Sequence, residues 1–289
     1  QMSQEGDSIL IPTPTFNGQL QMLASLKRKI IEIPADHRGI DLERLEFFMK
    51  QGSAKLCLLT ANFQNPLGYC LSHQQKQKIA QLAQQYQCFI LEDDIYGECS
   101  FQKERPLPIR YWDQQGYVIW CGSVSKSLSS AYRVGWFCLG QQLQHLRPQL
   151  LANNIGVNTP LQLGLADFIY SRGYREHLEG LRPKLMQQVE QYRAYILEVF
   201  NGIPIALSQS QGGYALWMQL PENMTGLALY YLAQSQGINI VPGEVFGEDL
   251  RYQHFIRLNA GHALTPEIRQ AIQQLADWVR ESYLSQSRL

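Results

Sequence analysis

Between Ser8 and Gly140, the sequence alternates short apolar segments with longer segments of helical pattern. A continuous apolar run bounded by turn residues is typical of a strand buried on both faces, and a helix between two such strands lets them run in parallel. The expected strands are 8–11, 29–33, 54–60, 88–91, 117–121 and 134–139. The first expected helix is 19–26, the second begins at 39–41 and ends at 49, and the third begins at a Ser72-x-x-Gln75 capping box. The sequence therefore predicts an α/β fold with a mostly parallel sheet flanked by helices.

After Gly140 the pattern changes to longer helices and separate short strands. The expected helices are 141–153, 160–172, 174–200, 225–236 and 265–284, and the expected strands are 203–207, 214–220, 238–242 and 254–258. Pro183 falls inside the third helix, where we expect it to kink or divide the helix. We predict a large domain over residues 1–172 and a smaller C-terminal α+β domain over residues 173–289.

The charge balance and the cysteine pattern exclude several classes of protein. The chain has 25 Lys+Arg and 25 Asp+Glu residues, without the basic stripe of a nucleic-acid surface. Its six cysteines contain no CxxC pair and fall mostly in apolar runs, as expected of reduced cysteines in a cytoplasmic protein. The histidines have no metal-binding spacing, and no apolar run is long enough to span a bilayer.

The loop after the strand 117–121 carries the first functional candidates. Ser123 and Ser125 precede Lys126, and Arg133 stands just before the next strand. A lysine amine can form a Schiff base with an aldehyde cofactor, while hydroxyls and a guanidinium can bind its phosphate. A solvated loop lysine is the alternative, and the short S-x-S-K string alone favours it, so the assignment depends on the surrounding residues.

Two other predicted strands also end in polar groups. Residues 92–96, Glu-Asp-Asp-Ile-Tyr, place Asp93 and Tyr96 on one turn, and carboxylates at a buried strand end are costly unless they bind something. Asn65 follows the strand 54–60 in a turn fixed by proline and glycine. Exposed carboxylates and an ordinary turn asparagine are the alternatives.

Phe16 and Arg257 complete the set of candidates. Phe16 lies at the C-terminal end of the first strand, where open α/β sheets bind ligands, so it could stack on a flat ring or simply fill the strand–helix junction. Arg257 is flanked by Ile256 and Leu258 inside an apolar strand. An arginine there needs an anion, either a structural carboxylate or the carboxylate of a ligand.

Taken in order, these elements closely resemble the fold-type I, pyridoxal-phosphate-dependent aminotransferases. The matching pieces are Asn65-Pro66-Leu67-Gly68, Asp93-Asp94-Ile95-Tyr96, Ser123-Val124-Ser125-Lys126 with Arg133, and Arg257. No piece is specific alone, but together they cover nearly the whole chain. The resemblance implies the pyridoxal-phosphate-dependent transferase fold for the large domain.

The resemblance also implies a role for each candidate. Lys126 would hold pyridoxal 5'-phosphate as a Schiff base and then move the substrate proton, and Asp93 would keep the pyridine nitrogen protonated so that the ring accepts electrons. The remaining implied roles are hydrogen bonds to the phenolic oxygen from Asn65 and Tyr96, phosphate binding by Ser123, Ser125 and Arg133, ring stacking by Phe16, and substrate binding by Arg257 and Asn65.

The sequences of these motifs look most like those of the MocR-type branch of the GntR regulators. The matching strings are N-F-Q-N-P-L-G, E-D-D-I-Y-G, R-V-G-W and V-P-G-E-V-F. In that branch, a DNA-binding winged helix-turn-helix precedes an aminotransferase-like domain that senses a small amine or amino acid. The first strand here directly follows a Gly6-Asp7 turn, so we expect the chain to begin inside a domain, without the small-residue turn that binds phosphate in the family.

Three hypotheses therefore stand. The first is the effector-sensing domain of such a regulator, binding DNA only through an N-terminal part absent from this chain. The second is a free-standing aminotransferase acting on amino acids and 2-oxo acids, and the third is an α/β protein without a cofactor. The family resemblance further implies a homodimer, and the length of the apolar runs predicts no membrane segment. Two further segments, Gly212-Gly213-Tyr214 and 242–246, either wall the substrate pocket or are ordinary turns.

Overall fold

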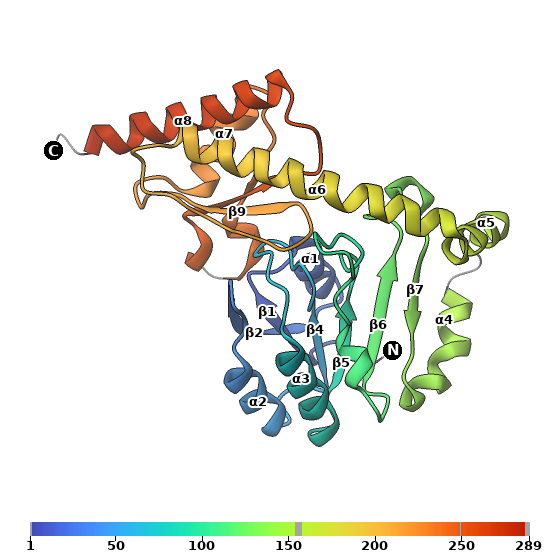
Figure 1. The fold of residues 1–289 in the computed structure, drawn as a ribbon. Coiled ribbons are helices and arrows are strands. Elements are labelled where there is room, and N and C mark those ends of the chain that lie inside the picture. The colour runs from blue at the N-terminus through green and yellow to red at the C-terminus, as the bar shows by residue number, and fades with distance from the viewer. Residues whose placement is uncertain (1, 154–157, 249, 287–289) are drawn as a thin grey trace.

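A computed structural model describes residues 2–153, 158–248 and 250–286, which form two sheets with helices around them (Figure 1). The larger sheet has seven strands in the order β3-β2-β1-β4-β5-β6-β7. They are β1 (Ser8–Thr13), β2 (Lys29–Asp36), β3 (Gly39–Ile40), β4 (Leu56–Leu59), β5 (Phe89–Asp93), β6 (Val118–Ser123) and β7 (Gly135–Cys138). The five central strands are parallel and the edge strands β3 and β7 are antiparallel, which confirms the predicted mostly parallel α/β sheet.

Helices cover both faces of this sheet because its strands are apolar on both sides. In β1, Leu10 packs in the cluster that contains Leu45 of α2 (Leu42–Lys50) and Ile79 of α3 (His73–Gln85). Ile9 packs on the opposite face, with Leu23 of α1 (Asn17–Ser25). The predicted capping box opens α3, since the Ser72 hydroxyl accepts from the Gln75 backbone and the Gln75 side chain accepts from the Ser72 backbone.

The second sheet is antiparallel and lies in the C-terminal part of the chain. Its strands are β10 (Val241–Pro242), β11 (Phe255–Asn259), β9 (Ala215–Gln219) and β8 (Ala206–Leu207), in that order. The helices α7 (Gly226–Ser235), α8 (Pro266–Gln286) and the long α6 (Arg172–Val199) pack with it around a second core. Two shorter helices, α4 (Arg147–Asn153) and α5 (Thr159–Tyr170), precede α6.

Several predicted elements differ from those in the structure. The expected helix 141–153 starts as a 3-10 helix (Gln141–Leu146) and becomes α-helical only at Arg147. Pro183 does not divide α6, because Arg182 and Leu185 on either side of it are buried and hold the helix against the rest of the molecule. Of the expected strand 203–207 only the last two residues pair, since β8 is an edge strand that meets β9 over two positions.

The two sheets meet in a shared apolar contact. Trp217 of β9 and Phe246 belong to the core cluster of the seven-stranded sheet, and their rings meet edge to face at 5.0 Å. Helix α6 extends from α5 beside the large sheet to the small sheet (Figure 1). The domain division at residues 172 and 173 stays a prediction. No helix in the described part of the chain is long and apolar enough to cross a membrane.

Candidate active site

The candidate residues gather where the parallel strands end. Because β1, β4, β5 and β6 run in the same direction, their C-terminal ends share one edge of the sheet. Asp93 is the last residue of β5 and pairs in register with Cys121 of β6, so the loop that carries Lys126 leaves the sheet beside Asp93. The Lys126 amine lies 5.5 Å from the centre of the Tyr96 ring.

Asp93 is held by donors from its own turn and from α1. Its Oδ1 accepts the backbone N–H of Ile95 at 3.2 Å, and its Oδ2 accepts the amide of Gln19 at 3.0 Å. Burial raises the pKa of the Asp93 carboxyl, while the hydrogen bonds and the nearby Lys126 amine lower it. Sequence reasoning missed Gln19, since nothing in the local pattern of α1 distinguishes it.

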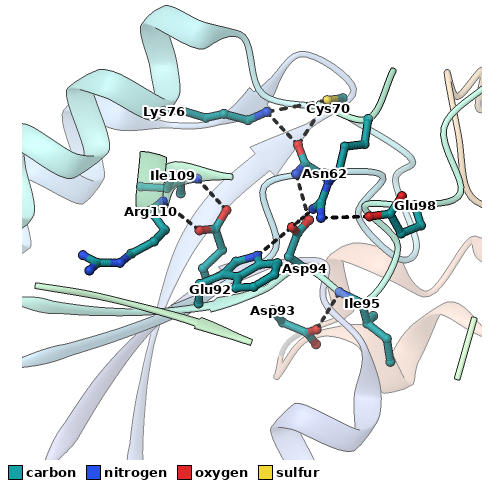
Figure 2. Close-up of polar contacts among 12 residues, drawn as sticks. Asn62, Cys70, Lys76, Glu92, Asp93, Asp94, Ile95, Glu98, Ile109 and Arg110 are labelled. Carbon is teal, nitrogen blue, oxygen red and sulfur yellow. Dashed lines mark hydrogen bonds and ion pairs between the residues drawn. The ribbon is translucent and has the colours of Figure 1, made fainter. Parts of the chain in front are cut away.

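The other two acids of the 92–94 run bind the protein itself. Glu92 is fully buried and accepts the backbone N–H groups of Ile109 and Arg110 at 2.7 and 3.1 Å (Figure 2). Burial raises the pKa of Glu92 to about 8, and the nearby Asp94 adds to this rise. Hydrogen bonds within the protein therefore explain why Glu92 and Asp94 lie at a strand end. Of the three acids, only Asp93 lies apart from these hydrogen bonds (Figure 2).

Asp94 is the centre of a buried polar network (Figure 2). It accepts from Asn62 Nδ2 at 2.8 Å and from Trp120 Nε1 at 2.7 Å, and it pairs with Arg105. Asn62 in turn accepts from Lys76, a fully buried lysine whose amine lies 2.6 Å from Asn62 Oδ1. A buried cation among carboxylates offsets their charge, so this network fixes the loop after β4 relative to the end of β5.

Asn65 lies in a loop that Gln64 fixes. The Gln64 side chain donates to the Pro14 carbonyl at 2.7 Å and accepts from the Leu67 backbone at 2.9 Å. This links the Asn65 loop to the loop that ends in Phe16. Asn65 Oδ1 is buried without a hydrogen-bond partner among the described residues, so it remains available to a further donor.

Ser123 and Ser125 form a compact turn next to Arg133. The two hydroxyls lie 2.8 Å apart, and that of Ser123 donates to the Val134 carbonyl at 2.9 Å. Arg133 has φ +54°, in the left-handed region, and lies just before β7. Phe16 precedes α1 with 44% of its surface exposed, so its ring is available to a ligand and is not buried at the strand–helix junction.

Arg257 enters from β11 of the small sheet. Its Nε is buried without a hydrogen-bond partner, and no carboxylate in the described ranges forms an ion pair with it. Burial lowers the pKa of Arg257, while the neighbouring Tyr96 and Tyr214 raise it. A partly buried guanidinium without an anion is an incomplete arrangement, because its desolvation is not offset. It is therefore suited to bind the carboxylate of a ligand.

The structure thus brings together Asp93, Tyr96, Lys126 and Arg257, each of which affects the titration of another. Phe16 and Asn65 lie in two linked loops at the same edge, and the Ser123 hydroxyl donates to the carbonyl of Val134, the residue after Arg133. A lysine, a partly buried carboxylate and unpartnered polar atoms can capture an aldehyde, polarise it and bind an anion. Asn62, Lys76 and Arg105 were not predicted, and only the buried environment of Lys76 distinguishes that lysine.

Known proteins share this fold and much of this sequence. A family model described as aminotransferase class I and II matches residues 1–275. The HTH-type transcriptional regulator YdcR of Escherichia coli, itself uncharacterized, is 32% identical over 281 residues, which cover 97% of this chain and 60% of YdcR. Aromatic-amino-acid aminotransferase 1 of Thermococcus litoralis is 28% identical over 285 residues, covering 96% of this chain and 67% of the enzyme.

A solved structure agrees with these sequence matches. The multiple substrate aminotransferase of Thermococcus profundus superposes with a TM-score of 0.84 at 28% identity, over 98% of this chain and 71% of that one. The chain spans about 60% of the length of YdcR, and it spans 58% of YjiR, a second E. coli HTH-type regulator with 31% identity. The matches therefore concern one part of those longer proteins.

Proposed function

This chain belongs to the class I and II aminotransferase family, and from that premise we propose that it is the effector-sensing domain of a MocR-type GntR transcriptional regulator, with pyridoxal 5'-phosphate bound at Lys126. The observation that carries the proposal is the convergence of Lys126, Asp93 and two unpartnered polar groups at one edge of the sheet. The identity of 32% to YdcR and 31% to YjiR supports the regulator assignment.

The residues present fit this cofactor. Asp93 is a partly buried carboxylate that can pair with a protonated ring nitrogen, and the Asn65 amide nitrogen can donate to the ring oxygen. Ser125 and the adjacent Arg133 carry donors suited to a phosphate, whereas the Ser123 hydroxyl would have to leave the Val134 carbonyl to donate to one. Phe16 is the exposed aromatic ring that would stack on the cofactor.

When bound, pyridoxal phosphate supplies an electron sink that makes the α-proton of an amino acid acidic. The Lys126 amine would hold the cofactor aldehyde and, when not bonded to it, is the base that would accept that proton. The Asp93 carboxylate would pair with the protonated ring nitrogen, and the Tyr96 hydroxyl would donate to the ring oxygen. Arg257 binds the ligand carboxylate and so orients the α-carbon, with the Asn65 amide beside it.

The proposal extends to the whole protein. An upstream winged helix-turn-helix would bind DNA, and binding of an amine or amino acid in the site around Lys126 would change the affinity for the operator. The full protein is a cytoplasmic homodimer with two domains in this region, divided near residue 172. Support for a reducing compartment comes from the six cysteines, all of which are free.

A free-standing aminotransferase is the second candidate function. Its support is the 28% identity to the Thermococcus litoralis enzyme, of which this chain covers 67%. The same residues serve both functions, because sensing and turnover both require a site that holds the cofactor at Lys126 and admits a ligand amine. The difference lies in whether the reaction proceeds to release of a 2-oxo acid.

One experiment with the full-length protein separates the two functions. Purified protein with pyridoxal phosphate is incubated with a panel of amino acids and amines, with and without 2-oxoglutarate, and its binding to its own promoter DNA is measured in parallel. We expect a change in DNA affinity without sustained 2-oxo acid formation. Sustained turnover with no DNA binding would instead establish the aminotransferase.

A further inference from the structure

The backbone of Lys126 and of the residue after it is held by side chains from two other parts of the chain. The thiol of Cys99, in the segment just after Tyr96, donates to the Lys126 carbonyl at 3.5 Å. One residue later, the Ser127 carbonyl lies 2.6 Å from Nε2 of His177 in α6. Ser127 is buried, so water cannot easily take the place of this partner.

The contact with Ser127 defines what the imidazole of His177 does. A carbonyl oxygen can only accept a hydrogen bond, so Nε2 of His177 must carry a hydrogen and donate it. A neutral imidazole with its hydrogen on Nε2 and a charged imidazolium both satisfy this requirement. The imidazole therefore acts as a hydrogen-bond donor that fixes the position of the Ser127 backbone.

Tyr174 supports this contact from the same face of α6. It lies three positions before His177, and residues with this spacing are neighbours on a helix. Its hydroxyl lies 3.2 Å from the Ser127 hydroxyl, and its ring is stacked on the imidazole with an angle of 18° between the planes. The side chain and the carbonyl of Ser127 thus both contact α6.

Helix α6 is itself attached to the turn that contains Tyr96. Arg182 donates from Nε to the Glu98 carbonyl at 3.0 Å, and its guanidinium pairs with the Glu98 carboxylate at 2.9 Å. Leu185, one turn further along, packs with Tyr96 and Cys99 in one buried cluster. The helix passes the C-terminal end of β6 (Figure 1), so it is a rigid support for the loop between β6 and β7.

We propose that His177, with Tyr174 beside it, is a positioning residue that fixes the Ser127 backbone and thereby directs the Lys126 amine toward the cofactor aldehyde. This inference rests on the proposed function, because it requires that Lys126 hold the cofactor. A lysine amine stands at the end of a flexible four-carbon chain, so its place depends on a fixed backbone. Placement matters, since an error of about 1 Å can cost on the order of 100-fold in rate.

The test measures how fast the full-length, cofactor-free protein captures pyridoxal phosphate, with the bond at Lys126 trapped by borohydride and located by peptide mapping. His177→Ala removes the donor while alanine maintains the helix. We expect capture to slow by roughly 3- to 10-fold, the effect of losing one hydrogen bond.

Three further variants separate hydrogen bonding from packing. His177→Gln carries an amide N–H that can reach the Ser127 carbonyl, and it should restore most of the rate. His177→Leu has a similar size without a donor and should remain as slow as His177→Ala. Glu179→Ala, at an exposed residue of α6, is the control and should match the wild type.

Each outcome is decisive. A capture rate in His177→Ala equal to that of the wild type overturns the positioning role while the assignment of Lys126 stands, even if the stability to urea is lower. Recovery of the rate in His177→Leu, or no recovery in His177→Gln, would show that the ring only packs, and this also contradicts the proposal. If the wild type gives no trapped pyridoxyl group on Lys126, the proposed function and this inference both fail.

Discussion

The amine of Lys126 lies 5.5 Å from the centre of the Tyr96 ring, although the two residues belong to loops that follow different strands. Tyr96 is buried and Asp93 ends the strand just before it. A single amine is therefore placed beside a phenol and within the electrostatic reach of a partly buried carboxylate.

Lys126→Ala is expected to abolish covalent capture of pyridoxal phosphate, because the amine that bonds to the aldehyde is gone. Borohydride reduction followed by intact-mass measurement of the full-length protein detects the pyridoxyl group. Lys184→Ala, at an exposed lysine of α6, should retain full labelling. Equal labelling of the Lys126→Ala variant and the wild type would refute the assignment of Lys126.

Asp93→Asn is expected to keep the fold and slow the chemistry. Burial raises the pKa of Asp93, so at pH values above that pKa the charged carboxylate lowers the stability of the folded protein. The asparagine side chain carries no charge, and the substitution should therefore not lower the free energy of unfolding at pH 8. Cofactor-dependent exchange of the substrate α-proton, followed by NMR in deuterated water, should fall by about 100-fold or more. Asp167→Asn, at an exposed residue of α5, is the control, and unaltered exchange in Asp93→Asn would argue against a contact with the ring nitrogen.

Arg257→Ala is expected to weaken binding of carboxylate ligands by about 2 to 5 kcal/mol while leaving pyridoxal phosphate bound. The guanidinium is partly buried and forms no ion pair in the described part of the chain, so a ligand anion gains most of its interaction. Calorimetry with an amino acid and with its decarboxylated amine measures the difference. The loss should be confined to the amino acid, and equal losses for both ligands would mean that Arg257 does not bind the carboxylate.

Glu92→Gln is expected to flatten the pH dependence of stability. The pKa of Glu92 is about 8 in the folded protein and 4.5 ordinarily, so the folded state holds a proton that the unfolded chain has released between these values. The free energy of unfolding of the wild type therefore falls as pH rises through that window, by at most about 1.4 kcal/mol per pH unit, and levels off above it.

Urea denaturation at pH 5, 6.5 and 8 checks this prediction. The decrease between pH 5 and 8 should be smaller in Glu92→Gln by more than about 1 kcal/mol. Glu43→Gln, at an exposed glutamate in the first turn of α2, should follow the wild type. Parallel curves for all three proteins would show that Glu92 does not change its proton affinity on folding.

Much of the fold and several site residues follow from local sequence. The apolar runs of β1, β4, β5 and β6 and the capping box of α3 are patterns of neighbouring residues, and they predicted the parallel sheet. Short edge strands were predicted less well, because β8 and β10 each depend on pairing with one partner over two residues. Nothing in 203–207 itself shows where that pairing begins.

The sequence by itself determined the order of strands and helices, the strand ends that carry Asp93, Asn65 and Lys126, and the likeness to aminotransferases. Only the tertiary structure decided that Gln19, 74 residues before Asp93, would bind it, that Glu92 and Asp94 would bind the protein's own donors, and that Tyr214 would meet Tyr96. The physical reason is that secondary structure depends on contacts between near neighbours in the chain. The partner of a buried polar group depends instead on which distant segment the packed sheets place beside it.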